Sequence, residues 1–123
     1  MSSAKKVNPL EPLELAHRLA GCAVEKKARQ LRLLDVGELT DYTNFVMIMT
    51  AGSDRHARAL ADHMQRELRS TARPFGVEGY QQGQWILLDY GDVIVHIFQQ
   101  DARLYYDLDG LWSEAKTIEV EQE

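Results

Sequence analysis

Residues 84–98, QWILLDYGDVIVHIF, constrain the fold of this chain more than any other segment. Two apolar runs flank a short connector of aspartate, tyrosine, glycine and aspartate, a pattern that predicts a β-hairpin with the two-residue loop Tyr90-Gly91. In that register Asp89 and Asp92 face each other, and like charges in directly opposed positions are destabilising. We therefore expect this end of the hairpin, with Tyr90 exposed beside it, to meet a positively charged partner or a metal.

The rest of the chain alternates between helical and extended patterns. Apolar residues recur at helical spacing in two long segments, and Ser53 is the natural N-cap of the second, where Asp54 adds favourable negative charge. The expected elements run helix, strand, strand, helix, strand, strand, strand, helix, at 9–30, 31–36, 44–50, 53–70, 75–78, 85–88, 93–98 and 101–112. This order predicts an α/β domain with a mixed sheet of about five strands flanked by helices.

Length and charge bound the class of protein. A chain of 123 residues forms one domain, and its net charge of −5 argues against broad binding to nucleic-acid phosphates while allowing a basic protein as partner. We assign residues 1–8 to a disordered arm, 9–115 to the single domain and 116–123 to an acidic flexible tail. The one cysteine, Cys22, lies among apolar residues of the first predicted helix, so core packing is expected.

A lone thiol also fits a reducing compartment, because it has no partner for an internal disulfide. No apolar run is long enough to span a bilayer, and the first residues lack a secretory pattern. We therefore expect a cytoplasmic protein that contacts neither a membrane nor a specific nucleic-acid sequence.

A glycine-serine step follows the most apolar predicted strand. Gly52-Ser53 resembles the sequence that opens the active site of polymerase-β-like nucleotidyltransferases, where amides at a helix N-terminus hold phosphate. Those enzymes also need carboxylates on adjoining strands to bind metal ions, whereas the Asp-x-Asp sequence at 107–109 falls far downstream. A structural role for Gly52 and Ser53, as a capped strand-to-helix turn, is therefore favoured. The alternative is an active or vestigial nucleotidyltransferase that uses Ser53, Asp54, Asp89 and Asp92.

The histidines do not predict a metal site. The chain has four of them, at positions 17, 56, 63 and 96. His56 and His63 are two helical turns apart, and no cysteine or glutamate completes a spacing typical of zinc sites, so neither a metal nor another cofactor is expected. His96 shares a strand face with Ile94 and Phe98, which predicts a half-buried, hydrogen-bonded structural histidine.

Aromatic residues on an acidic background are typical of protein interfaces. The set consists of Trp85, Tyr90, Tyr105, Tyr106 and Trp112. Tryptophan and tyrosine act as anchors in interfaces, whereas stacking on nucleic-acid bases calls for basic residues between the rings, which this chain lacks. Trp112 and Leu111 are expected to pack the last helix onto the core instead.

Three separated motifs give the chain a resemblance to a known family. They are TDYTNFVMIMTAGSDRHARALADHM from Thr40, VEGYQQGQWILLDYGDVIVHIF from Val77 and ARLYYDLDGLWSEA from Ala102. Together they resemble the Iojap, or ribosomal silencing factor (RsfS), family, and the similarity extends over residues 13–115. The resemblance implies a fold related to nucleotidyltransferases without their catalytic carboxylates, so no catalytic residue is expected.

The resemblance also implies a function. Family members bind the large ribosomal subunit through ribosomal protein number fourteen, block association with the small subunit and repress translation when nutrients run short; many pair as homodimers off the ribosome. The residues expected to meet the basic ribosomal protein are Glu78, Trp85, Asp89, Tyr90, Gly91, Asp92, Tyr105 and Tyr106. Those expected to be structural are Gly52, Ser53, His96 and Trp112. A homodimeric scaffold without ribosomal contact remains a further alternative.

Overall fold

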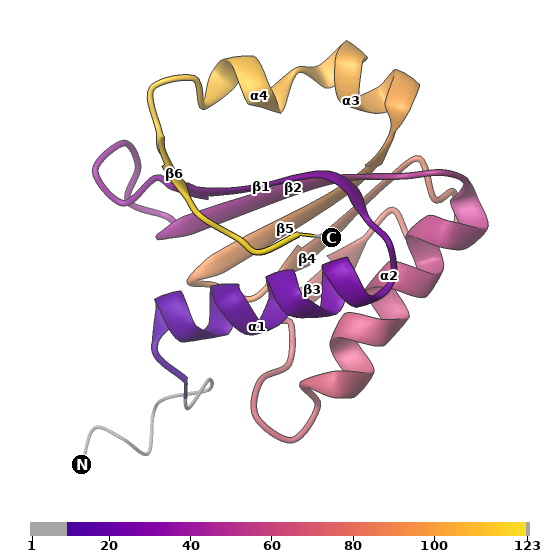
Figure 1. The fold of residues 1–123 in the computed structure, drawn as a ribbon, viewed down its shortest axis with the longest axis horizontal. Helices are drawn as coiled ribbons and strands as arrows, with labels where there is room; N and C mark the ends of the chain where they lie inside the picture. Colours follow the sequence, from indigo (N-terminus) through magenta and orange to yellow (C-terminus); the bar gives the residue numbers. More distant parts are fainter. Residues whose placement is uncertain (1–9, 123) are drawn as a thin grey trace.

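A six-stranded mixed β-sheet forms the centre of the computed structural model, which describes residues 10–122 (Figure 1). The elements are α1 (Pro12–Glu25), β1 (Arg29–Asp35), β2 (Phe45–Ala51), α2 (Asp54–Glu67), β3 (Gly76–Glu78), β4 (Trp85–Asp89), β5 (Val93–Gln99), α3 (Gln100–Tyr106), α4 (Leu108–Leu111) and β6 (Lys116–Ile118). The strand order is β3-β4-β5-β2-β1-β6. The mixed α/β class is confirmed, with one strand more than expected. The arm predicted at 1–8 lies outside the described residues.

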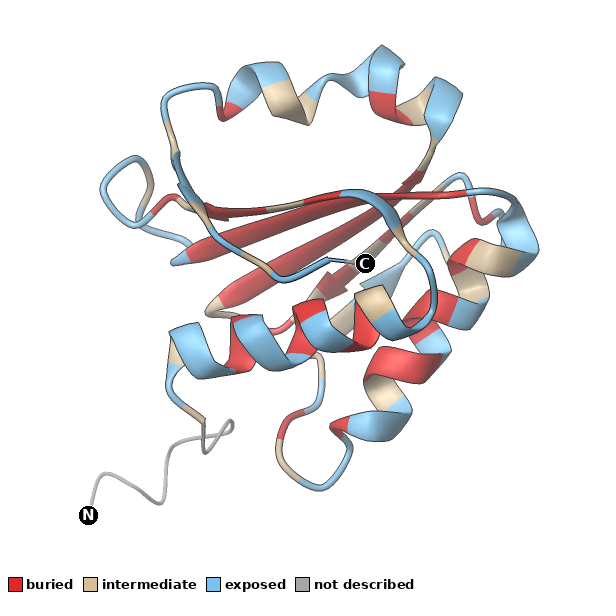
Figure 2. Ribbon diagram, in the orientation of Figure 1, coloured by how far each residue is buried: buried red, intermediate tan, exposed pale blue. Residues whose placement is uncertain are grey.

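Strands β2 and β5 lie side by side at the centre of the sheet. They pair in parallel, whereas all the other strand pairs are antiparallel. Every residue of β2 is buried, as its continuous apolar sequence predicted, because helices cover both faces of the central strands (Figure 2). This central pair fixes the positions of the loops at both ends of the sheet.

The two faces of the sheet are covered by different helices. Figure 1 shows α1 and α2 on one face and α3 and α4 on the other. The larger core cluster lies under α1 and α2, whereas a smaller cluster, which includes Phe98 and Trp112, lies on the α3–α4 side. Trp112 is buried as predicted, but Leu111 is 66 % exposed, so Leu111 does not pack the last helix onto the core.

The chain after α4 forms a sixth strand instead of a flexible tail. Residues 116–118 pair with β1, and Ile118, opposite Leu33, packs against the larger core. Further along, the Gln122 side chain donates to the Leu31 carbonyl at 3.4 Å. Strand β6 was not expected because three residues with one strongly apolar side chain carry no recognisable period. Among the described residues, no helix has the length and apolar character needed to cross a membrane.

The turn of the β4–β5 hairpin lies one residue later in the chain than predicted, which changes the strand partner of Asp89 from Asp92 to Ile94. Asp89 pairs with Ile94, and the Tyr90 N–H donates to the Val93 carbonyl at 2.9 Å, so the loop is Gly91-Asp92. Gly91 has φ +81°, a conformation that favours glycine at the first loop position. Because side chains alternate between faces, Tyr90 joins the larger core, and the prediction that it is exposed was wrong.

Candidate functional site

One half of the α3–α4 face of the sheet, over β3 and β4, is open. Opposed residues in an antiparallel pair point to the same face, so Glu78 and Leu87, which are paired, both lie on it. Trp85 and Asp89 alternate with Leu87 along β4 and share that face. At the edge of α3, the Tyr106 ring contacts Trp85 with centroids 4.5 Å apart. We call Glu78, Trp85, Leu87, Asp89, Tyr105 and Tyr106 the β4–α3 surface.

The β4–α3 surface is aromatic and acidic. Tyr105 is 81 % exposed and Tyr106 50 % exposed, and their rings meet edge to face at 5.0 Å. No lysine or arginine occurs anywhere in residues 76–102, so Glu78 and Asp89 give the surface a negative charge. Exposed tyrosines beside carboxylates suit a protein partner with a basic surface. The structure therefore brings together five of the eight residues expected at the contact.

Trp85 is held in place by a buried histidine. Its indole N–H donates to Nδ1 of His96 at 3.1 Å, and its ring stacks on Phe98 at 5.0 Å. His96 is 8 % exposed, and burial lowers its pKa to about 4. The imidazole is therefore neutral at pH 7 and keeps the lone pair that accepts from Trp85. His96 is hydrogen-bonded as predicted, but it is buried and not half-buried.

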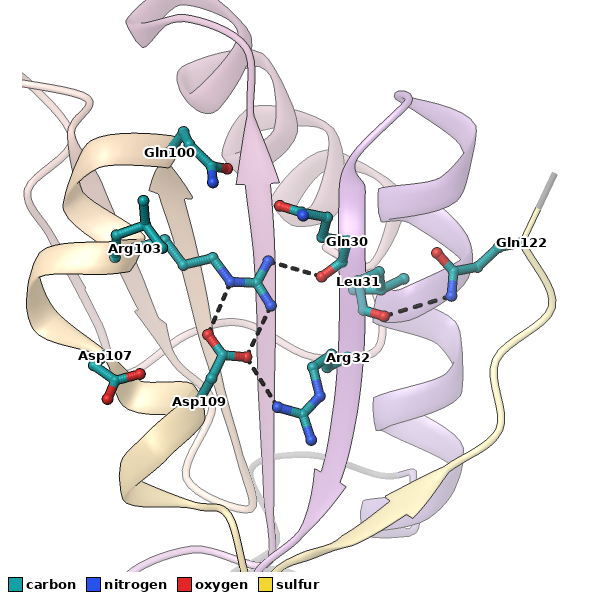
Figure 3. Close-up of a pocket in the computed structure, with 9 residues that line it drawn as sticks. Gln30, Leu31, Arg32, Gln100, Arg103, Asp107, Asp109 and Gln122 are labelled. Atoms are coloured by element: carbon teal, nitrogen blue, oxygen red, sulfur yellow. Dashed lines mark hydrogen bonds and ion pairs between the residues drawn. The ribbon is translucent and has the colours of Figure 1, made fainter.

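An arginine on α3 anchors that helix to the sheet (Figure 3). Arg103 is 7 % exposed, and its Nη1 donates to Thr50 Oγ1 and to the Gln30 carbonyl, both at 2.8 Å. Its Nε and Nη2 donate to the two carboxylate oxygens of Asp109 at 3.0 and 2.9 Å. This bidentate pair joins α3 to α4 and fixes the direction in which the neighbouring tyrosines point.

A pocket of 470 Å³ lies beside this anchor, and Arg32 also lines it (Figure 3). Arg32 Nη1 donates to Asp109 at 2.9 Å, so both arginines share one carboxylate. Hydrogen bonding by Arg103, assisted by Arg32, lowers the pKa of Asp109 to about 2. Arg32, Arg103 and Asp109, which line the pocket, therefore form one ion-pair network. The sequence interpretation missed Arg103; the available signal was an arginine between apolar and aromatic residues, six positions before an aspartate.

Asp89 and Asp92, at the hairpin turn, accept hydrogen bonds from other residues of the domain. The Asp89 carboxylate accepts from the Gly91 N–H at 2.8 Å. The Asp92 carbonyl accepts from the backbone N–H groups of Asn44 and Phe45, at 3.1 and 3.0 Å. Asp89 pairs with Ile94, so the predicted pairing of Asp89 with Asp92 was wrong. Tyr90, fully buried on the α1–α2 side, has no exposed surface to offer a partner.

The glycine-serine step lies at the other end of the sheet. Ser53 caps α2, as predicted, by accepting from the His56 N–H at 3.0 Å. It follows the carboxyl end of β2, whereas Asp92 precedes β5, whose register with β2 places it at the amino end. Seven-residue strands separate these ends by roughly 20 Å. The structure therefore does not bring Asp89 and Asp92 to Ser53 and Asp54.

His56, beside this cap, forms hydrogen bonds with two separate turns of the chain. Its Nδ1 accepts from the Gly52 N–H at 2.9 Å, so the ring proton is on Nε2, which donates to the Lys26 carbonyl at 2.7 Å. The neutral imidazole thus links the end of α1 to the start of α2. An added Cβ at Gly52 would approach the flexible Arg29 guanidinium to 2.6 Å. The hydrogen bond from the Gly52 N–H to His56 supports the structural assignment of Gly52.

The remaining histidine of interest, His63, has neighbours that the sequence spacing did not reveal. Its Nε2 lies 2.8 Å from Glu25 Oε1, and Cys22 lies close to both side chains. Cys22 is buried as predicted, and burial, with smaller contributions from Glu25 and Glu67, raises the pKa of its thiol to about 11. The sequence spacing did not reveal this cluster, because its members come from two helices.

The fold and the β4–α3 surface define a small α/β domain with an aromatic, acidic face. Comparison with known proteins identifies its family. The model of the family described as "Ribosomal silencing factor during starvation" matches residues 9–123. The chain belongs to this family of ribosomal silencing factors.

Individual relatives agree with this assignment. The chain is 35 % identical over 113 residues to "Ribosomal silencing factor RsfS" of Halalkalibacterium halodurans, covering 88 % of this chain and 93 % of the relative. A more distant relative, 26 % identical over 72 % of this chain and 41 % of its own length, is "Mitochondrial assembly of ribosomal large subunit protein 1" of Mus musculus. A crystal structure of a Chromobacterium violaceum protein superposes with a TM-score of 0.82 at 29 % identity, covering 93 % of this chain and 95 % of the other.

Proposed function

We propose that this protein binds the large ribosomal subunit through the basic ribosomal protein number fourteen and sterically blocks the small subunit. Translation is thereby repressed when nutrients are limited. The observation that carries the proposal is the β4–α3 surface, in a chain that belongs to the ribosomal silencing factors. The name of the mouse relative, which refers to the large subunit, supports the choice of subunit.

The chemistry of the surface suits a basic protein partner. Trp85 and Leu87 are partly buried and form the apolar base of the surface. The more exposed Tyr105 and Tyr106 lie at its edge. Glu78 and Asp89 supply charges that become paired on contact with lysine or arginine. The same negative charge disfavours direct contact with ribosomal RNA phosphates, so the proposed contact is with protein.

A steric blocker acts by occupancy and has no turnover. We therefore propose that the protein is not an enzyme, that it saturates at one copy per large subunit and that it works in the cytoplasm. Off the ribosome, we propose a homodimer as the resting state. Inhibition of subunit joining at ratios far below one copy per subunit would instead indicate catalysis.

Co-sedimentation with isolated subunits tests the proposal. The full chain should sediment with large subunits and not with small ones. Tyr105→Ala removes a side chain that is 81 % exposed, so it should leave the melting temperature unchanged and weaken binding at least tenfold, which corresponds to about 1.4 kcal/mol.

Leu13→Ala is the matched control for this experiment. Leu13 is also an exposed apolar residue, at 44 %, but it lies on α1, on the opposite side of the sheet. Its loss should not change binding. Equal binding by the Tyr105 and Leu13 variants would remove the β4–α3 surface from the contact, and equal sedimentation with both subunits would contradict the proposed specificity.

A further inference from the structure

Three side chains with metal-ligating atoms meet where α1 packs against α2. Cys22 and Glu25 lie about one turn apart on α1, and His63 faces them from α2. The thiol sulfur, one carboxylate oxygen and one imidazole nitrogen all lie within 4.8 Å of one another. Helices α1 and α2 cover the face of the sheet opposite the β4–α3 surface, so the proposed function does not use this cluster.

The distances are close to those of a tetrahedral metal site. Zinc binds sulfur at about 2.3 Å and nitrogen or oxygen at about 2.0–2.2 Å, which places neighbouring ligand atoms about 3.4 Å apart. The His63 Nε2 and Glu25 Oε1 atoms are now 2.8 Å apart, and the remaining separations are below 4.8 Å. Small side-chain rotations are enough to seat an ion between the three donors.

The surroundings of the cluster favour a cation. Glu25 and Glu67 both place negative charge near the Cys22 sulfur, and Arg18 contributes a smaller positive charge. His63 is 9 % exposed, and Nε2 is the ring nitrogen that faces Glu25. The Glu25 side chain is 67 % exposed, which provides a path for the ion from solvent and room for a water ligand.

The geometry points to a zinc site formed by Cys22, Glu25 and His63, with water in the fourth position, that joins α1 to α2. Sulfur, nitrogen and oxygen donors together match the ligand preference of Zn²⁺. Binding replaces the S–H bond with a Zn–S bond and releases the thiol proton to solvent. His63 binds through Nε2, so the proton that this nitrogen shares with Glu25 moves to Nδ1, and the carboxylate binds without proton loss. The ion replaces the direct His63–Glu25 contact with an interhelical link through the metal.

Cobalt substitution tests this site directly, because the chain contains a single cysteine. Purified full-length protein without a histidine tag is titrated with Co²⁺ under reducing conditions. A thiolate-to-cobalt charge-transfer band and tetrahedral d–d bands should appear and saturate at one ion per chain. Added Zn²⁺ should remove both bands and raise the melting temperature of the protein.

Four variants separate this site from other binding. Cys22→Ser should abolish the charge-transfer band, and His63→Gln and Glu25→Gln should each weaken Co²⁺ binding at least tenfold. His17→Gln, which alters an exposed histidine on α1, should bind like the original chain. Circular dichroism checks that each variant folds. If His63→Gln does not fold, Co²⁺ binding by Glu25→Gln tests the site. Absence of the band at saturating Co²⁺, or a band unchanged by Glu25→Gln, overturns the site.

Discussion

At the turn between β4 and β5, the Asp89 carboxylate has two roles, one as a hydrogen-bond acceptor and one as a surface charge. Single substitutions can separate these roles. Its Oδ1 accepts from the Gly91 N–H at 2.8 Å, and its charge belongs to the β4–α3 surface. Asp89→Asn keeps an oxygen acceptor and removes the charge, whereas Asp89→Ala removes both. Comparison of the two variants therefore shows whether Asp89 stabilises the turn, binds the partner or does both.

We predict that Asp89→Asn changes the free energy of unfolding by less than about 0.5 kcal/mol, whereas Asp89→Ala costs about 1 kcal/mol, the contribution of one hydrogen bond. Both should weaken large-subunit binding about tenfold or more, because an interfacial charge loses its partner. Urea unfolding and co-sedimentation measure the two effects. Unchanged binding by Asp89→Asn would limit the residue to its structural role.

His96 gives stability a pH dependence of defined sign. Its pKa falls from 6.5 in the unfolded chain to about 4 in the folded protein, so between these values the unfolded state binds more protons. Stability is therefore complete above pH 6.5 and is lost as the pH falls toward 4, by up to about 3 kcal/mol. Asp109, with its pKa lowered to about 2, adds a separate loss below about pH 4.

We predict that His96→Gln flattens the pH dependence of the urea midpoint between pH 6.5 and about 4, because glutamine does not titrate. Its amide oxygen can still accept from Trp85. His17→Gln, which alters an exposed histidine, should retain the original slope. If the slope in His96→Gln equals that of the original chain, the pH dependence belongs to other groups.

At the scale of elements, α3 depends on one ion-pair network more than on its apolar contacts. The helix has seven residues, and its one buried side chain is that of Arg103. Asp109 pairs with this arginine through both oxygens and also with Arg32. The α3 segment therefore holds Tyr105 and Tyr106 in place through a carboxylate on the next helix.

We predict that Asp109→Asn destabilises the protein by about 3 kcal/mol, because the buried Arg103 guanidinium loses its charge partner. Ribosome binding should weaken even at temperatures where the sheet stays folded, since the tyrosines lose their fixed position. Asp101→Asn, which alters an exposed acid in the first turn of α3, is the control and should change neither property strongly. Equal stability of the two variants would contradict the anchoring role.

The sequence predicted the elements with strong local signals and missed those that depend on distant partners. The continuous apolar run of β2 and the Ser53 cap could be identified locally, because strand burial and capping follow from neighbouring residues. Strand β6 becomes a strand only because β1 offers it an edge. The position of the hairpin turn depends on which residue takes the positive φ, and this residue is Gly91. The prediction placed the turn one residue too early, so Tyr90 was assigned to an exposed loop although it is buried.

The candidate site was also predictable only in part. Aromatic and acidic composition pointed to Trp85, Tyr105 and Tyr106, which the structure brings together. The arginine anchor and the Cys22–Glu25–His63 cluster could not be found from spacing, because their members are far apart in sequence: 53 positions separate Arg103 from Thr50, and 38 separate His63 from Glu25.

At the scale of the whole molecule, the two ends of the sheet carry different groups. The end after β2 has the capped N-terminus of α2, with Gly52 and Ser53, and the other end has the hairpin turn with Asp89 and Asp92. A nucleotidyltransferase needs phosphate-binding amides and metal-binding carboxylates within one site. In this fold the two sets are roughly 20 Å apart along β2 and β5.

We predict that the protein neither binds Mg²⁺-ATP more tightly than the millimolar range, about −4 kcal/mol, nor transfers nucleotides. Isothermal titration calorimetry at pH 7.5 measures the first and a radiolabel transfer assay the second. Asp54→Asn tests the carboxylate beside the cap: Asp54 Oδ1 accepts from the Arg55 N–H at 2.7 Å, which supports the start of α2, so its loss should affect stability and no activity. A micromolar nucleotide site that this variant abolishes would show that the carboxylate serves catalysis and would overturn the assignment of a steric blocker.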